Sequence, residues 1–218
     1  MERIVLKFGG TSLGNTEKIL SVAKIIQQKH KSGVEMLVVV SAMSGVTNDL
    51  IVKSKKISSD FEEAELDTLL SSGEQASSAL LAAALIKFGI KSRSWLSWQI
   101  PILTEGNFGS SRILHIETKK INSFIKSGGI PIIPGFQGVS KDSRLTTLER
   151  GGSDTSAVAV AKFFQADYCE IFTDVDGVYT TDPNTLRKAK KIKIISYEEM
   201  LEMASLGSKV MQPHSIQD

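Results

Sequence analysis

The stretch Ile4-Val5-Leu6-Lys7-Phe8-Gly9-Gly10-Thr11-Ser12 gives the clearest indication of the fold class. Its first five residues are apolar except for Lys7, and a run without polar alternation is typical of a strand that is buried on both faces. The paired glycines that follow predict a tight turn into a helix. A strand that needs cover on both faces, with a helix directly after it, indicates an α/β protein.

The same pattern recurs along the chain. Three more apolar runs predict buried strands, at residues 36–40, 130–133 and 169–172. Between them apolar residues recur at intervals of three and four, as in residues 19–26 and 80–85, which indicates amphipathic helices. The sequence therefore predicts a three-layer α/β/α sandwich around a mainly parallel sheet, in which ligands bind at the loops that leave the carboxyl ends of the strands.

Composition places the chain among ordinary globular proteins. With 218 residues, 41% of them hydrophobic and 23% charged, it is too apolar for a disordered chain, and its length predicts one domain. The formal charge of +2 gives no indication of nucleic-acid binding. The longest apolar runs, such as residues 79–86, are too short to cross a bilayer, so no membrane role is expected. A single cysteine, Cys169, and no signal-peptide pattern predict a cytoplasmic protein.

The loop after the first predicted strand could hold a phosphate group. Gly9 and Gly10 let the backbone approach an anion closely, while the Lys7 ammonium and the N–H groups of a helix start supply positive potential. The pattern is neither the P-loop nor the dinucleotide fingerprint. A tight turn capped by Ser12 or Asn15 would use the same residues, so this motif alone leaves both interpretations open.

Two further loops carry small polar residues. Residues 41–48 follow the second predicted strand, and their hydroxyls suit a surface that hydrogen-bonds a small polar ligand, although a capped helix start has the same composition. Residues 69–75 are expected to precede an alanine-rich helix, which would place Glu74 in its first turn. The helix dipole alone favours an acid there.

Residues 146–156, Thr-Thr-Leu-Glu-Arg-Gly-Gly-Ser-Asp-Thr-Ser, give the strongest indication of a ligand. They place a guanidinium, two glycines and three consecutive capping-type side chains at one predicted helix N-terminus, where capping needs only one such side chain. Arg150 could bind a carboxylate or a phosphate, and Asp154 could hold an ammonium, a metal or a catalytic lysine.

Residues 173–183 follow the last predicted strand. Their Asp-Val-Asp-Gly segment resembles the start of a calcium loop, but Pro183 occupies the position of the required acid, so an EF-hand is excluded. The loop could hold an adenosine through its hydroxyls and the Tyr179 ring, although a plain turn would use the same residues. His30, His115 and His214 lie outside all of these loops. Phosphoryl transfer to a carboxylate fits, because that acceptor needs no strong base.

Seven motifs, in this order and spacing, resemble the catalytic domain of the bacterial aspartokinases, which belong to the amino-acid kinase superfamily. They are Lys7-Phe8-Gly9-Gly10-Thr11-Ser12, Ser41-Ala42-Met43, Ser72-Gly73-Glu74, Gly135-Phe136-Gln137-Gly138, Arg150-Gly151-Gly152-Ser153-Asp154, residues 173–183 and Gly207-Ser208-Lys209-Val210. The resemblance covers essentially the whole chain and implies the amino-acid kinase fold. It also implies transfer of the γ-phosphoryl group of MgATP to the side-chain carboxylate of L-aspartate. The product would be 4-phospho-L-aspartate, in the first step of lysine, methionine and threonine biosynthesis.

The resemblance also implies roles for individual residues. Lys7 would neutralise charge on the phosphoryl group in flight, and Asp154 would orient Lys7. Phosphate and ATP contacts would come from Lys7, Phe8, Gly9, Gly10, Ser41, Thr173, Asp174, Tyr179, Asp182, Lys209 and Val210. Aspartate contacts would come from Thr47, Glu74, Arg150, Gly151, Gly152, Ser153 and Asp154. Mg²⁺ is expected to bind through the ATP phosphates, with no metal ligand from the protein.

One kinase domain over residues 1–218 is expected, with a phosphate- and aspartate-binding part at about residues 1–150 and a nucleotide-binding part at about residues 151–218. It is expected to be short at its C-terminal end and to lack the regulatory ACT domains of the family. A homo-oligomer is expected, because the kinase domains of the family often pair, and neither nucleic acid nor membrane is expected as a partner. Two alternatives stay open: another amino-acid kinase, of the glutamate or N-acetylglutamate type, and a truncated nucleotide-binding module without turnover.

Overall fold

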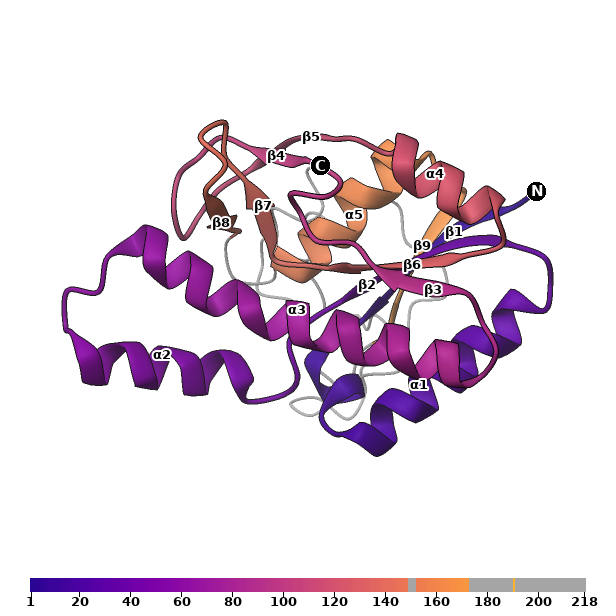
Figure 1. The fold of residues 1–218 in the computed structure, drawn as a ribbon, viewed down its shortest axis with the longest axis horizontal. Coiled ribbons are helices and arrows are strands. Elements are labelled where there is room, and N and C mark those ends of the chain that lie inside the picture. The colour runs from indigo at the N-terminus through magenta and orange to yellow at the C-terminus, as the bar shows by residue number, and fades with distance from the viewer. Residues whose placement is uncertain (149–151, 173–189, 191–218) are drawn as a thin grey trace.

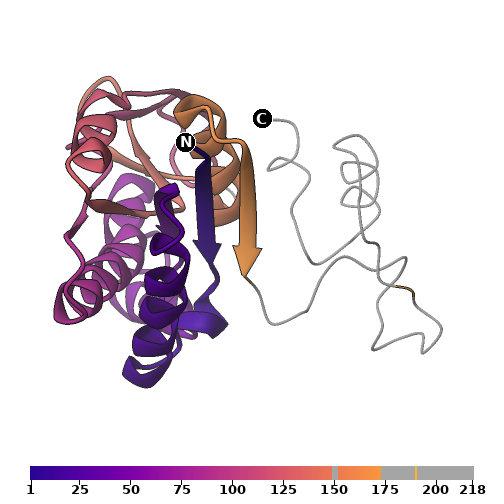
Figure 2. The same cartoon turned by 90° about the vertical axis from the view of Figure 1, so that its right-hand side faces the viewer.

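The computed structural model describes residues 1–148, 152–172 and 190, and within them a five-stranded sheet forms the centre of the molecule (Figure 1). Its strands lie in the order β3 (Ser92–Ser94), β6 (Ile130–Pro134), β2 (Glu35–Val40), β1 (Arg3–Phe8) and β9 (Tyr168–Phe172). All of its pairings in the described residues are parallel. Figure 2 shows β9 beside β1. The four predicted strands are thus confirmed as neighbours in one parallel sheet.

Helices cover both faces of this sheet and produce three layers (Figure 1). One face packs against α1 (Thr16–His30) and α3 (Glu63–Lys87), and the other packs against α4 (Lys119–Lys126) and α5 (Gly152–Phe164). Successive residues of β1 point to opposite faces, so Leu6 joins the α1 and α3 side and Val5 the α5 side. The predicted α/β/α sandwich is confirmed.

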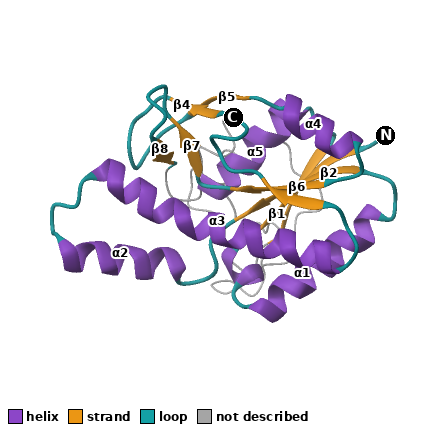
Figure 3. Ribbon diagram, viewed as in Figure 1, coloured by secondary structure: helices purple, strands orange, loops and turns teal. Residues whose placement is uncertain are grey.

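A second, four-stranded sheet, which was not predicted from the sequence, lies at one end of the molecule (Figure 3). Its strands lie in the order β5 (Ile113–Ile116), β4 (Ile102–Thr104), β7 (Gln137–Val139) and β8 (Leu145–Thr147). The strands β7 and β8 form an antiparallel hairpin, and β8 packs against α3. Two further elements complete the described chain, the 3-10 helix η1 (Gly10–Leu13) and α2 (Val46–Ile57), which packs on α3.

The helix α3 corrects one expectation about Glu74. The prediction that residues 69–75 precede a helix is wrong, because α3 begins at Glu63 and Glu74 lies in its middle. In the structure the hydroxyls of Ser71 and Ser72 donate to carbonyls one turn back, at 2.9 and 2.6 Å, so they do not end the helix. Gly73 serves close packing, since a Cβ there would lie 2.9 Å from the Ala42 Cβ.

Among the described helices, α3 is also long and apolar enough, by length and composition, to cross a membrane. It packs against α1, α2, the main sheet and β8, and 56% of its most apolar 18-residue window is buried inside the fold. The acidic side chains of Asp67 and Glu74 are among its buried residues. These contacts are those of a core helix that joins the two sheets.

Candidate active site

A buried ion pair joins β1 to the first turn of α5. The Lys7 Nζ lies 2.5 Å from Asp154 Oδ1, and the two side chains are only 8% and 14% exposed. Lys7 shares a strand face with Val5, the face that α5 covers, which is why its ammonium meets the start of that helix. Buried ion pairs add little net stability because desolvation offsets the attraction. We therefore interpret the pair as a contact that fixes the position of the Lys7 ammonium.

The Gly9–Gly10 turn lies directly beside this ammonium. A Cβ on Gly9 would lie 3.6 Å from Lys7 Nζ, and a Cβ on Gly10 would lie 2.7 Å from the Ala42 carbonyl oxygen. The Ser44 N–H donates to the Gly10 carbonyl at 3.2 Å, which ties the loops after β1 and β2 together. Gly10 is thus required for space. The alternative interpretation of this loop, a turn capped by Ser12 or Asn15, is also present in part: Asn15 caps α1, because its side chain accepts a hydrogen bond from Lys18 N–H at 2.9 Å.

Glu74 presents a carboxyl group that is only half satisfied. The residue is 4% exposed, and its Oε1 accepts a hydrogen bond from Ala42 N–H at 3.1 Å. Its buried Oε2 has no hydrogen-bond partner among the residues that the structure describes. Burial raises the pKa of the Glu74 carboxyl to about 7, against the opposing effect of the Ala42 N–H. A buried acceptor is costly without a donor, and the ammonium of a ligand is one group that could supply it.

The turn between β6 and β7 supports the start of α5. Phe136 has a positive φ of 66°, and its N–H donates to Ser156 Oγ at 2.9 Å. The Ser156 hydroxyl in turn donates to the Gly152 carbonyl at 2.7 Å. A Cβ on Gly135 would lie 3.0 Å from Ser153 atoms, so this turn packs tightly against the helix start.

Buried amides tie β7 to α3. Gln137 is fully buried, and its Nε2 donates to the Ser71 carbonyl at 3.1 Å. The Gln75 Nε2 donates to Gln137 Oε1 at 3.0 Å. Gly138 admits no side chain, because a Cβ there would lie 2.8 Å from the Ile102 carbonyl oxygen. The Phe136-Gln137-Gly138 motif is therefore a structural joint between the helix that carries Glu74 and the second sheet.

The remaining candidate residues fall into two groups. Ser41 and Thr47 lie partly buried at the carboxyl end of β2 and in the first turn of α2, and Ser153 is buried at the start of α5. Outside the described residues lie Arg150, Gly151, Thr173, Asp174, Tyr179, Asp182, Lys209 and Val210. The structure thus brings together the loops after β1 and β2, the middle of α3 and the N-terminus of α5.

Cys169 and the described histidines take no part in this arrangement. Burial, and then the charge of Asp154, raise the pKa of the Cys169 thiol to about 12, so the thiol stays protonated at neutral pH. The His115 ring on β5 packs edge-on against Phe163. Within the described ranges no group of three or more His, Cys, Asp or Glu side chains could hold a metal ion.

Sequence reasoning missed a second acid on α3. Asp67 is 1% exposed and accepts hydrogen bonds from Thr147, the last residue of β8. It precedes Glu74 by seven residues, about two helical turns, which places both acids on one face of the helix. That spacing was the available signal, although the partner of Asp67 lies 80 residues away along the chain.

The chain belongs to the amino acid kinase family, whose family model matches residues 2–217. It is 48% identical over 217 residues to an aspartate kinase of Pseudomonas putida. The matched region covers 100% of this chain and 53% of that relative. The chain thus spans about half the length of the curated relatives it matches.

Solved structures of two aspartokinases have a similar fold. The aspartate kinase from Synechocystis gives a TM-score of 0.85 at 42% identity, over 98% of this chain and 36% of that one. The aspartokinase III of E. coli, in complex with aspartate and ADP, gives a TM-score of 0.88 at 26% identity, over 99% of this chain and 59% of that one.

Proposed function

We propose that the chain is the catalytic part of an aspartate kinase, which transfers the γ-phosphoryl group of MgATP to the side-chain carboxylate of L-aspartate and forms 4-phospho-L-aspartate. The observation that carries the proposal is the Lys7–Asp154 ion pair beside the Gly9–Gly10 turn. The Glu74 carboxyl lies nearby in the fold, and its Oε2 has no partner in the part of the chain that the structure describes. The similarity to proteins named aspartate kinase, and to one solved with aspartate and ADP, supports it.

The phosphate side of the site needs positive charge more than it needs a base. A carboxylate acceptor is ionised at neutral pH, so no proton has to be removed before it attacks phosphorus. Lys7 would stabilise the negative charge of the phosphoryl group in the transition state, and Asp154 would keep its ammonium aimed at that group. The glycine backbone beside Lys7 Nζ leaves room for phosphate oxygens. Magnesium bound to the ATP phosphates would supply further charge neutralisation.

The substrate side needs groups for one ammonium and two carboxylates. The buried Glu74 Oε2 would accept from the α-ammonium, and loss of the Glu74 proton on binding would satisfy both charges. We expect Arg150 to bind a carboxylate, with Thr47, Gly151, Gly152 and Ser153 as further contacts. On the nucleotide side, the contacts of Phe8, Ser41, Thr173, Asp174, Tyr179, Asp182, Lys209 and Val210 remain predictions.

The wider setting follows from the same proposal. The reaction would be the first step of lysine, methionine and threonine biosynthesis in the cytoplasm, and the kinase domains would pair as a homo-oligomer. The part at about residues 1–150 would hold aspartate and phosphate, and the part at about residues 151–218 would hold the nucleotide.

The test is an acceptor series with MgATP. Hydroxylamine traps an acyl phosphate as a hydroxamate, and L-aspartate should yield it whereas L-glutamate, N-acetyl-L-glutamate and a blank should not. The Lys7→Ala variant is the matched control for contaminating kinases. A hydroxamate with one of the other acceptors would reassign the substrate. Binding of ATP without any hydroxamate would contradict the proposal and favour a nucleotide-binding module without turnover.

A further inference from the structure

Asp67 on α3 is a buried carboxylate held by uncharged donors. Its Oδ2 accepts from Thr147 N–H at 2.7 Å, and its Oδ1 accepts from the Thr147 hydroxyl at 2.6 Å. The Gly109 N–H is shared between both oxygens, at 3.1 and 3.0 Å. In the described part of the chain Asp67 enters none of the ion pairs. Its described partners lie on the last residue of β8 and in the loop before β5, so Asp67 ties α3 to both segments.

Thr147 connects this acid to the start of α5. It ends β8, and the next residue, Leu148, is buried and donates its N–H to the Phe136 carbonyl at 2.9 Å. Leu148 also packs against the first residue of α5, since a Cβ on Gly152 would lie 2.7 Å from the Leu148 Cβ. A displacement of Thr147 would therefore reach the N-terminus of α5 through two tight contacts.

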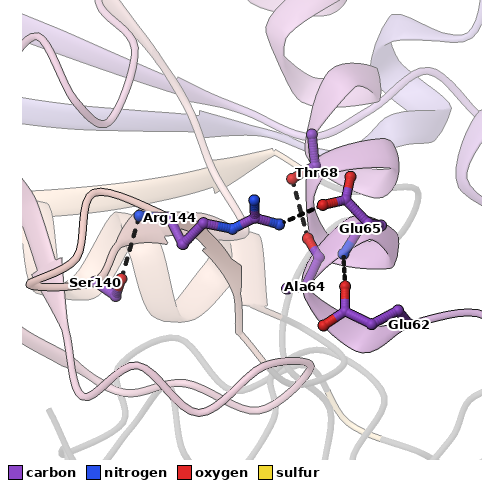
Figure 4. A network of polar contacts seen from close by, with 6 residues as sticks. All are labelled: Glu62, Ala64, Glu65, Thr68, Ser140 and Arg144. Carbon is purple, nitrogen blue, oxygen red and sulfur yellow. Dashed lines mark hydrogen bonds and ion pairs between the residues drawn. The ribbon is translucent and has the colours of Figure 1, made fainter.

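Other contacts already attach the β7–β8 hairpin to α3. At the surface, the Arg144 guanidinium pairs with the Glu65 carboxylate at 2.6 Å, and the backbone N–H of Arg144 donates to Ser140 Oγ (Figure 4). Deeper in the fold, Gln137 bonds to α3. Asp67 differs from both contacts because it accepts a hydrogen bond from the backbone N–H of Thr147, the last residue of β8.

We propose that Asp67 is a positioning residue, which sets the start of α5 at the right distance from Glu74 by holding Thr147. This inference rests on the proposed function, because it concerns the groups that would bind aspartate. Asp67 and Glu74 share one face of α3, so this one helix would position two groups that contact the substrate. It would position Glu74 directly, and it would position Ser153 through Thr147 and Leu148.

We expect the KM for L-aspartate to change most. The body of α5 is held by its own core residues, Ala157, Val160 and Phe164. Lys7 is held by β1 and, through Asp154, by the first turn of α5. Loosening Thr147 would therefore disturb the substrate contacts at the helix start first and the Lys7 ammonium only through Asp154. The KM for L-aspartate should rise by a larger factor than kcat falls, and the KM for ATP should stay nearly unchanged.

The experiment compares four variants of the full chain. Asp67→Asn and Thr147→Val weaken the link, Thr147→Ser keeps the hydroxyl, and Glu65→Gln breaks the exposed pair between the same helix and hairpin. We expect the KM for L-aspartate to rise by about 10-fold in Asp67→Asn and at least ~3-fold in Thr147→Val, and to stay within about 2-fold in the other two. If Asp67→Asn does not fold, Thr147→Val against Thr147→Ser decides the question.

A second readout needs no turnover. Backbone hydrogen exchange in peptides that contain Thr147, Leu148 and the first turn of α5 should be faster in Thr147→Val than in Thr147→Ser or Glu65→Gln. Equal exchange and an equal KM in Thr147→Val and Thr147→Ser would overturn the inference. If the wild-type chain makes no hydroxamate, the proposed function fails, and the exchange rates alone decide whether Asp67 positions α5.

Discussion

Replacing Glu74 with Gln should remove a pH dependence from the stability of the protein. Burial raises the pKa of the Glu74 carboxyl from its ordinary value of 4.5 to about 7. Between pH 4.5 and about pH 7 the folded chain keeps a proton on Glu74 that the unfolded chain releases. The contribution of this proton to the free energy of unfolding is therefore fully present below pH 4.5 and is lost as the pH rises to about 7. At ~1.4 kcal/mol for each pH unit, the loss amounts to roughly 3 kcal/mol.

The assay is urea unfolding of the wild type and Glu74→Gln between about pH 4.5 and about pH 8. Glutamine keeps an acceptor for Ala42 N–H but carries no titrating proton. Relative to the wild type, the variant should therefore gain roughly 3 kcal/mol across this range. Glu65→Gln removes a carboxyl group at an exposed position of the same helix and serves as the control. A difference between Glu74→Gln and the wild type that does not change with pH would contradict a raised pKa of Glu74.

The remaining predictions concern the phosphate and substrate sides of the site. Lys7→Ala should lower kcat by ~10²-fold or more, measured as aspartate-dependent ADP release, and a near-normal kcat would exclude the assigned role. Gly10→Ala would place a Cβ 2.7 Å from the Ala42 carbonyl oxygen, so the free energy of unfolding should fall by about 1–3 kcal/mol in a denaturant titration, and an unchanged value would show that the two loops can move apart. Arg150→Ala should mainly raise the KM for L-aspartate in steady-state kinetics; a fall in kcat alone would contradict a binding role.

The main sheet could be predicted from the sequence because its strands are apolar on both faces. Residues 36–40 and 130–133 needed no other signal than an unbroken apolar run, and both lie in the parallel sheet. The second sheet gave no such signal. Strands as short as β7 and β8, three residues each, contain too few positions for a period to be visible.

The site was only partly predictable for a related reason. Lys7 and the glycines beside it stood out because a charge and two small residues interrupt an apolar pattern. The residue pattern alone left the partner of Asp154 open among an ammonium, a metal and a lysine, and the family resemblance implied Lys7. The contact itself depends on the strand face of Lys7 and on the position of α5. The contact of Asp67 with Thr147 joins residues 80 positions apart, so it depends on the tertiary fold.

Phosphorus NMR of the chain with MgATP and L-aspartate would observe phosphoryl transfer to the aspartate side chain directly. We expect a new acyl-phosphate signal that appears only with L-aspartate, grows with the ADP signals and is absent from the Lys7→Ala variant. Formation of ADP and inorganic phosphate without an acyl phosphate, with hydroxylamine trapping no hydroxamate, would contradict it.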